Sequence, residues 1–277
     1  NPQAVRPLVA RLQDPHLKFF CADALGKLGA PEAIPPLLDL IERETNSLIR
    51  RTAIIALGKI GPPLQIESLL RYLEAPNLAP AVVEVLCSLG GQNAEKTLIE
   101  MIDPDHPLCI EAVKGIEKVG TERSVESLVN LLGNIPDYLA RHVSNALSNI
   151  PESVPLLIEA LEDPDKRTWA VVTLGTLGDP QAVSPLMRHR HNSRNVEQAI
   201  KRIGLPAVDP LLRLLPDHED FIMDFTLQAG ESALPSLLQL LEEKRHSNFV
   251  EEALVGLGNQ TVSPLLDQLE ETSSPDT

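Results

Sequence analysis

The sequence is poor in aromatic residues and has no long hydrophobic run. Aromatic residues make up 3% and hydrophobic residues 43% of its 277 positions, so Leu, Val, Ile and Ala must form the core. Such a core favours helices that pack through aliphatic side chains. No apolar run approaches the roughly 18 residues that a membrane span needs. No secretory signal peptide is visible, and the chain begins at Asn1 rather than Met.

Cysteine and positive charge are also scarce. Cys21, Cys87 and Cys109 lie in apolar helical contexts without the spacing of metal ligands. We therefore expect buried thiols in a reducing compartment and a cytoplasmic location, with no metal site. The formal net charge of −15 argues against nucleic acid as the main ligand, because nucleic-acid binders need a basic surface.

One pattern that ends in glycine recurs along the chain. The clear copies are "CADALGKLG" (21–29), "TAIIALGKIG" (52–61) and "AVVTLGTLG" (170–178), and weaker copies end at Gly90, Gly120, Gly204, Gly230 and Gly258. Consecutive glycines are 26 to 32 residues apart, except for one double interval that contains "HVSNALSNI" (142–150), where Asn149–Ile150 replaces the glycine. Each copy reads as a helix, here called helix A, whose terminal glycine suits a left-handed cap.

A second pattern follows each glycine. Examples are "AIPPLLDLI" (33–41), "AVSPLMRHR" (182–190), "ALPSLLQLL" (233–241) and "TVSPLLDQL" (261–269). Their apolar residues recur at i, i+3, i+4 and i+7, which predicts an amphipathic helix B. Each unit is therefore helix A, a tight turn, helix B and a short link such as Asp-Pro.

Neither helix can bury its apolar stripe alone, but stacked pairs can. We therefore predict an all-α fold, a right-handed α-solenoid with about eight A/B pairs after a leading B helix at 2–12. We expect one solenoid domain over residues 1–271, truncated at its N-terminus because it starts in mid-repeat, and a disordered tail at 272–277.

The stretch "DPDKRTWAVVTLGTLGDPQAVSPL" (163–186) closely resembles the bacterial HEAT-like repeats named for the phycobilisome lyase subunits. The matching residues are Asp163, Pro164, Arg167, Leu174, Gly175, Leu177, Gly178, Asp179, Pro180, Ala182, Val183, Pro185 and Leu186. "DPHLKFFCADALGKLGAPEAIPPL" (14–38) is almost as close, with Lys18 at the Arg position. The resemblance covers nearly the whole chain and implies a HEAT-like solenoid, but the matching residues are structural. Arg50 keeps the Arg position in the next unit, whereas Ala79, Cys109, Ser193, Glu219 and Ser247 replace it elsewhere.

Motifs for nucleotide binding, zinc proteases and serine hydrolases are absent. Deoxyhypusine hydroxylases, which are built on similar helical repeats, hold a di-iron centre with several His-Glu pairs, and this chain has one pair, His218–Glu219. The acidic stretch "DHEDFIMD" (217–224) is interpreted as a helix start, where acids complement the helix dipole, with a cation site as the alternative.

Charge is distributed unevenly. Residues 205–277 carry a net −11 and residues 1–204 a net −4, whereas 185–202 carry +4. Such polarity can steer a charged partner, although it also serves solubility.

Arg190 breaks the repeat, because the matching position of every sister B helix is Leu or Ile. One hypothesis is a binding patch for a carboxylate-bearing partner, either an acidic protein segment or the propionates of a bilin. Its residues would be Arg188, His189, Arg190, His191 and Arg194. The alternative is a solvated, frayed helix end. We also expect the B helices to line the groove of the solenoid, with polar residues after their Leu pairs facing it: Asp39, Glu100, Asn130, Glu159, Arg188, Arg213, Gln239 and Asp267.

These observations predict a non-catalytic, cytoplasmic scaffold or adaptor that binds proteins in the groove of the solenoid and needs no cofactor. The partner is a protein with an acidic segment or a second HEAT-like subunit. The alternative, which the resemblance implies, is a bilin lyase subunit or a lyase-like chaperone that acts on the phycobiliproteins of the phycobilisome, with a bilin as its ligand.

Overall fold

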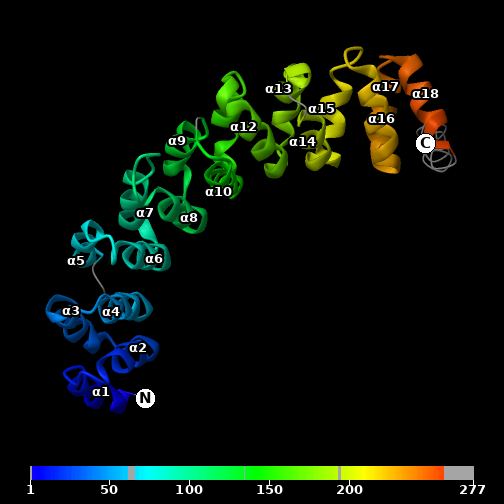
Figure 1. Cartoon of the computed structure of the whole chain (residues 1–277). Helices are drawn as coiled ribbons and strands as arrows, with labels where there is room; N and C mark the ends of the chain where they lie inside the picture. The colour runs from blue at the N-terminus through cyan, green and yellow to red at the C-terminus, as the bar shows by residue number, and fades with distance from the viewer. Residues whose placement is uncertain (1, 62–65, 134, 193–194, 259–277) are drawn as a thin grey trace. The chain divides into compact units, whose positions relative to one another are not determined.

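The computed structural model describes residues 2–61, 66–133, 135–192 and 195–258, which form helices and turns without a strand (Figure 1). The chain divides into two compact units, Asn1–Ser153 and Val154–Thr277. Each unit is a stack of helix pairs, the arrangement of an α-solenoid. The predicted B helix at 261–269, the predicted tail at 272–277, Arg194 and Asp267 lie outside the described residues.

The helices alternate as the two sequence patterns predict. The first unit contains α1 (Val5–Arg11), α2 (Lys18–Leu28), α3 (Ile34–Arg43), α4 (Ser47–Ile60), α5 (Glu67–Leu70), α6 (Ala79–Leu89), α7 (Gly91–Glu100), α8 (Cys109–Val119), α9 (Glu122–Leu131) and α10 (Asp137–Ser148). The second contains α11 (Val154–Ala160), α12 (Pro164–Leu177), α13 (Val183–Arg188), α14 (Val196–Ile203), α15 (Val208–Leu212), α16 (Glu219–Ala229), α17 (Leu234–Glu242) and α18 (Ser247–Leu257). Short 3-10 helices are η1 (Pro2–Ala4), η2 (Pro31–Ala33), η3 (Arg71–Glu74), η4 (Pro151–Ser153), η5 (Pro180–Ala182), η6 (Arg190–Asn192), η7 (Leu205–Ala207) and η8 (Gly230–Ala233).

The even-numbered helices are the predicted A helices and the odd-numbered helices are the B helices. The first unit holds the leading B helix α1, four complete pairs and α10, and the second holds α11, three complete pairs and α18. The consecutive helices α10 and α11 bring the number to the eight predicted pairs, and α18 starts a ninth. The A helix predicted over 142–150 without a terminal glycine is confirmed as α10.

Neighbouring A helices approach closely because glycines leave room between them. A Cβ added to Gly26 of α2 would lie 2.7 Å from the Cα of Ala56 in α4. In the second unit, a Cβ on Gly175 of α12 would lie 2.6 Å from the Cα of Ala199 in α14. Both distances are well below van der Waals contact. These glycines are therefore needed for the approach of the next helix rather than for a turn.

Figure 1 shows the first unit as two rows of helices, with the even-numbered A helices along the inner side of its curve and the odd-numbered B helices along the outer side. The expectation that B helices line the groove is therefore wrong for this unit. The physical reason is the close approach of the A helices, because a stack bends toward the row whose members are nearer to one another.

Seven of the eight terminal glycines have a positive φ, but only two adopt the left-handed cap that the pattern predicts, because the other five combine it with ψ between −135° and −158°. Gly29 and Gly178 are left-handed caps with φ of 63° and 74°. Gly120 has φ of −66°, so α8 ends without a left-handed residue.

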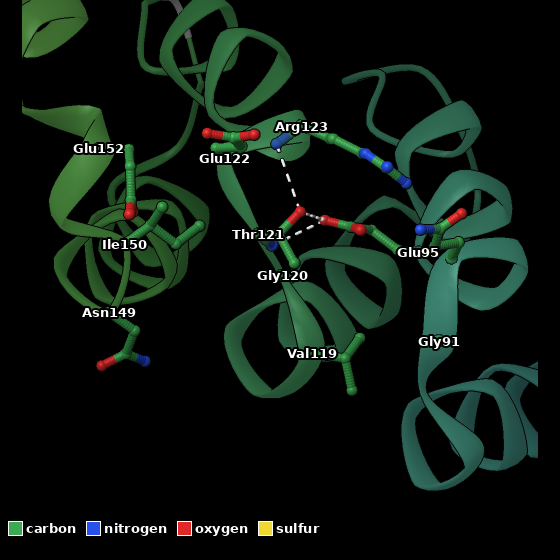
Figure 2. A pocket seen from close by; sticks show the side chains of 11 residues that line it. Gly91, Glu95, Val119, Gly120, Thr121, Glu122, Arg123, Asn149, Ile150 and Glu152 are labelled. Atoms are coloured by element: carbon green, nitrogen blue, oxygen red, sulfur yellow. Dashed lines mark hydrogen bonds between the residues drawn. The ribbon is translucent and has the colours of Figure 1, made fainter.

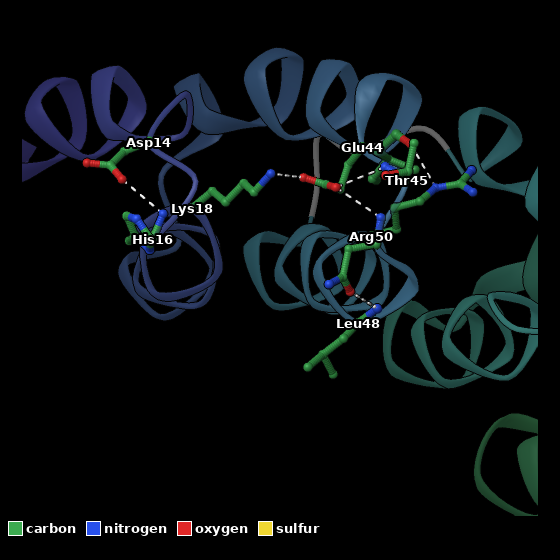
Figure 3. Close-up of polar contacts among 9 residues, drawn as sticks. Asp14, His16, Lys18, Glu44, Thr45, Leu48 and Arg50 are labelled. Atoms are coloured by element: carbon green, nitrogen blue, oxygen red, sulfur yellow. Dashed lines mark hydrogen bonds and ion pairs between the residues drawn. The ribbon is translucent and has the colours of Figure 1, made fainter.

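The link between one B helix and the next A helix is held by side chains at the Arg position (Figure 3). Arg50 donates from Nε to the carbonyl of Ile41 in α3 at 2.9 Å, and Arg167 donates to the carbonyl of Leu161, just past α11, at 2.6 Å. Both arginines thus satisfy carbonyls that the end of a helix leaves without a partner. This contact explains why the repeat pattern carries Arg here.

Lys18 takes the same position in α2 and forms an ion pair with Glu44 after α3. The Glu44 carboxylate also accepts hydrogen bonds from the backbone N–H groups of Thr45 and Asn46, both at 2.9 Å. The Lys18 ammonium and then the Asn46 N–H lower the pKa of the half-buried Glu44 carboxylate. Glu44 therefore ties α2 and α3 to the start of α4.

We predict that Gly175→Ala lowers the free energy of unfolding by about 1 kcal/mol or more, because overpacking against the Ala199 backbone outweighs the gain in helix propensity. Gly256→Ala is the matched control. A Cβ there would meet the Cδ2 of Leu227 at 2.7 Å, at the end of a flexible, exposed side chain that can turn away. Chemical denaturation measures both, and equal losses in the two variants would contradict the role of Gly175.

The lowered pKa of Glu44 makes a prediction about pH. A carboxylate whose pKa is lower in the folded state stabilises the fold above its unfolded value of about 4.3, and this contribution is lost as the pH falls through the folded pKa. Glu44→Gln should therefore lower the free energy of unfolding by about 1 kcal/mol at pH 7. Between pH 7 and pH 3, the free energy of unfolding of this variant should fall less than that of the wild type. Glu32→Gln, at an exposed carboxylate, is the control. Parallel pH curves for Glu44→Gln and the wild type would refute the prediction.

Candidate protein-binding surface

Each A helix of the first unit presents a row of solvent-facing residues at i, i+4 and i+8 on the same helix face. We call these positions in the first unit the A stripe. They are exposed or half-exposed throughout. The A stripe consists of Phe19, Asp23 and Lys27 of α2; Arg51, Ile55 and Lys59 of α4; Pro80, Glu84 and Ser88 of α6; Ile110, Lys114 and Lys118 of α8; and Arg141 and Asn145 of α10 with Asn149 at its end.

The A stripe is basic although the protein is acidic. It carries six Lys or Arg against two Asp or Glu, whereas residues 1–153 as a whole carry fourteen against nineteen. The stripe therefore has a net charge of +4 in a unit whose net charge is −5.

Only part of this positive charge is neutralised within the chain. Asp23 forms ion pairs with Lys27 at 2.6 Å and Lys59 at 3.1 Å. The ammonium of Lys27, and then that of Lys59, lowers the pKa of Asp23. The other four basic side chains of the stripe make no hydrogen bond or ion pair within the described residues: Arg51, Lys114, Lys118 and Arg141.

A hollow of about 140 Å³ interrupts the A stripe between α6 and α8. Pro80, Val83 and Gly115 contribute its apolar surface, and Lys114 and Lys118 stand on the α8 side. Cys87 also lines the hollow, and Glu84 and Glu111 complete it. Burial raises the pKa of the Cys87 thiol. The hollow thus offers room for an aliphatic side chain beside two unpaired ammonium groups.

A larger cavity of about 480 Å³ lies at the turns between A and B helices of the first unit (Figure 2). Its best-defined polar group is Glu95, which is only 3% exposed and accepts hydrogen bonds from the backbone N–H and the hydroxyl of Thr121, both at 2.7 Å. Thr121 in turn caps the start of α9. These contacts join α7 to α9 and give Glu95 a structural role.

Arg190, the residue that interrupts the repeat pattern, finds its partners within the second unit. Helix α13 ends at Arg188, and Arg190 follows in η6. Its guanidinium donates to Glu197 at 2.9 Å from Nε and 2.8 Å from Nη2, and it stacks over Phe221 at 4.9 Å. The α-helix therefore ends early, as the alternative interpretation proposed, but Arg190 finds a carboxylate in its own chain rather than only water.

The other residues of the predicted patch have different surroundings and do not form one surface. His189 is 8% exposed, and its Nε2 lies 3.2 Å from Glu162, while its Nδ1 has no partner within the described residues. Arg188 is exposed, and the exposed ring of His191 lies 6.1 Å from that of His218. Arg194 is outside the described residues. Arg188 and His191 are thus the members that remain accessible.

The predicted polar positions on the described B helices of the second unit, Glu159, Arg188, Arg213 and Gln239, are exposed. Arg213 and Gln239 come together at a hollow of about 150 Å³, where Gln239 donates to Glu243 at 3.1 Å. Glu159 lies on α11 and does not line this hollow. In the first unit, Asp39 is already paired with Arg43 at 2.7 Å.

The A stripe was missed because sequence reasoning placed the groove on the B helices. Its signal was present in the repeat register, since lysine recurs two residues before the terminal glycine in Lys27, Lys59 and Lys118. Within the described residues, no three or more His, Cys, Asp or Glu side chains are placed to hold a metal ion. No helix in the described part of the chain is long and apolar enough to cross a membrane.

Comparisons with known proteins agree with this architecture. Residues 3–80 match the family of HEAT repeats, and residues 166–189 match the phycobilisome (PBS) lyase HEAT-like repeat. Deoxyhypusine hydroxylase of Danio rerio is 26% identical over 253 residues, which cover 73% of this chain and 83% of that protein.

Two solved structures are also similar. The structure of human deoxyhypusine hydroxylase in complex with glycerol is 23% identical, covers 73% of this chain and 85% of that one, and has a TM-score of 0.34. The complex of CpcE and CpcF of phycocyanin lyase from Nostoc sp. PCC7120 is 21% identical, covers 80% and 91%, and has a TM-score of 0.42. The family matches thus identify HEAT-type repeats in residues 3–80 and 166–189, and the stacked helix pairs continue the same arrangement between and beyond these segments in the described residues.

Proposed function

We propose that the chain is a non-catalytic, cytoplasmic scaffold that binds a protein partner through the A stripe of its first unit. The observation that carries this proposal is the excess of basic side chains on the A stripe, six against two, in a unit that is otherwise acidic. Solenoids present extended surfaces for binding, and complementary charge steers and orients partners. The partner is therefore a protein with an acidic segment.

The fold itself gives no reason for these charges. Arg51 and Arg141 are exposed, belong to different repeats and make no hydrogen bond or ion pair within the described residues. Binding of an acidic partner explains why the positive charge is collected on one side of one row of helices.

We predict that the double variant Arg51→Glu and Arg141→Glu loses its partner. Immobilised wild-type chain should retain the same proteins from a lysate of the source organism in repeated experiments, and the variant should retain them at about a tenth of that level or less. Retention should also fall as salt rises, because exposed charges are screened. Quantitative mass spectrometry of the eluates measures both effects.

The matched control is the double variant Arg6→Glu and Lys96→Glu. It makes the same change in charge at two exposed residues of the same unit that lie on α1 and α7, away from the A stripe. It should retain the partner like the wild type. Equal losses in both double variants, or no specific retention by the wild type, would refute the proposal.

A second candidate is a phycobilin lyase subunit or a lyase-like chaperone, and the match of residues 166–189 to the lyase-type repeat is the observation that favours it. A bound bilin changes its visible absorbance, so mixing the chain with phycocyanobilin separates the two functions. The scaffold function predicts an unchanged spectrum, with or without a second HEAT-like subunit. A reproducible shift would favour the lyase function instead.

A further inference from the structure

Glu95 departs from the B-helix pattern at a position that packs in the core of the other repeats. It is 3% exposed, and it stands seven residues before Ile102 of the aligned apolar stripe. A carboxylate buried in place of an aliphatic side chain lowers stability unless its oxygens have donors. Packing alone therefore does not account for Glu95. At the matching position the other described B helices have an aliphatic residue: Val5, Ile34, Ile66, Val125, Val154, Val183, Val208 and Leu234.

The contacts within the chain use one of the two carboxylate oxygens. Oε1 of Glu95 accepts both hydrogen bonds from Thr121, one from the backbone N–H and one from the hydroxyl. Oε2 has no donor within the described residues, and it is in contact with open space rather than sealed in the core. Glu95 lines the cavity of about 480 Å³ at the turns of the first unit (Figure 2). Oε2 is therefore available to a ligand in this cavity.

The turn that holds Glu95 is also unlike the others. Gly120 lacks the positive φ of the other terminal glycines, and a Cβ there would lie 2.6 Å from the carbonyl oxygen of Ile116. The turn thus requires glycine for a reason other than a left-handed conformation. It leads directly into Thr121, whose N–H fixes Oε1 of Glu95 at 2.7 Å. Two departures from the repeat pattern therefore meet at one edge of the cavity.

The charges around the cavity favour a cation. The charged side chains that line it among the described residues are Glu95, Glu122, Glu152 and Arg123. Glu122 and Glu152 also complement the starts of α9 and η4, so the buried Glu95 indicates the ligand more specifically. Arg123 is exposed, and its guanidinium makes no hydrogen bond or ion pair within the described residues. No three acidic groups of the described chain are placed to hold a metal ion, which leaves a cation that donates N–H bonds.

We propose that Oε2 of Glu95 binds a basic side chain, lysine or arginine, of a protein segment that lies across these turns. Ammonium and guanidinium groups supply both the donor and the charge that Oε2 lacks. The neutral amides of Gln92 and Asn149 also line the cavity and can bond the backbone of the segment. Among the described residues that line the cavity, Asn149 alone belongs to the A stripe. The site is therefore additional to the proposed function and takes a segment of the opposite charge.

Titration calorimetry with a trilysine peptide blocked at both ends tests the proposal. The wild type should bind the peptide saturably, and Glu95→Gln should bind it at least about tenfold more weakly. The Gln carbonyl can still accept from Thr121, but its NH₂ group puts a donor where Oε2 was. Glu126→Gln is the matched control, because it makes the same change in charge at an exposed residue of α9 that does not line the cavity. It should bind like the wild type.

Two further variants separate binding from folding. Arg123→Gln leaves Glu95 and Thr121 unchanged and should strengthen peptide binding about twofold or more, because it removes a like charge beside the site. Thr121→Val removes the hydroxyl donor and the cap of α9, so it should lower the unfolding temperature. It keeps Oε2 and the backbone N–H, and its peptide affinity should stay within about threefold of the wild type.

Spermidine, a free polyamine, distinguishes the source of the cation and should bind more weakly than the peptide, because it has no backbone for the two amides. Absence of saturable binding to the wild type, equal losses in Glu95→Gln and Glu126→Gln, or weaker binding by Arg123→Gln would each overturn the proposal. So would a loss in Thr121→Val as large as that in Glu95→Gln, or spermidine that binds as tightly as the peptide. None of these outcomes bears on the scaffold function, which is judged by Arg51 and Arg141 outside this cavity.

Discussion

The close approach of neighbouring A helices is the constraint on which the other features of this molecule depend. Where Gly26 meets Ala56 and Gly175 meets Ala199, no side chain separates the two backbones. This contact brings the A helices nearer to one another than the B helices and turns the first unit toward its A row. It also fixes which helix faces remain outside the core. The A stripe is the face that this packing leaves free.

Much of the fold follows from local chemistry and could be predicted from the sequence. Amphipathic spacing gives the alternation of A and B helices, and Asn46 and Asp163 start α4 and α12 by accepting backbone hydrogen bonds. The direction of curvature could not be predicted in the same way, because it depends on distances between helices that are some thirty residues apart. The role of the second-to-last glycine in the A pattern, as at Gly26, becomes clear only when Ala56 is placed against it.

For the candidate site, too, some features could be predicted from the sequence and others could not. The dense cluster around Arg190 attracts notice in the sequence, yet Glu197 and Phe221 satisfy Arg190 within the chain. The partner residues come from the next two A helices, so the B-helix pattern alone could not reveal them. The charged residues of the A stripe, by contrast, are spread along the sequence, since each repeat contributes only one or two of them. Its sign becomes visible after the repeats are aligned on one helix face.

The separation between packing positions and stripe positions has a consequence for how such a protein can diversify. Gly26 and Leu25 serve the stack, whereas Lys27 on the same turn faces solvent. A substitution on the stripe can therefore change the choice of partner with little loss of stability, and a substitution between helices can change stability without touching the partner. Duplication of one repeat would lengthen the recognition surface by a single row while leaving the existing rows unchanged.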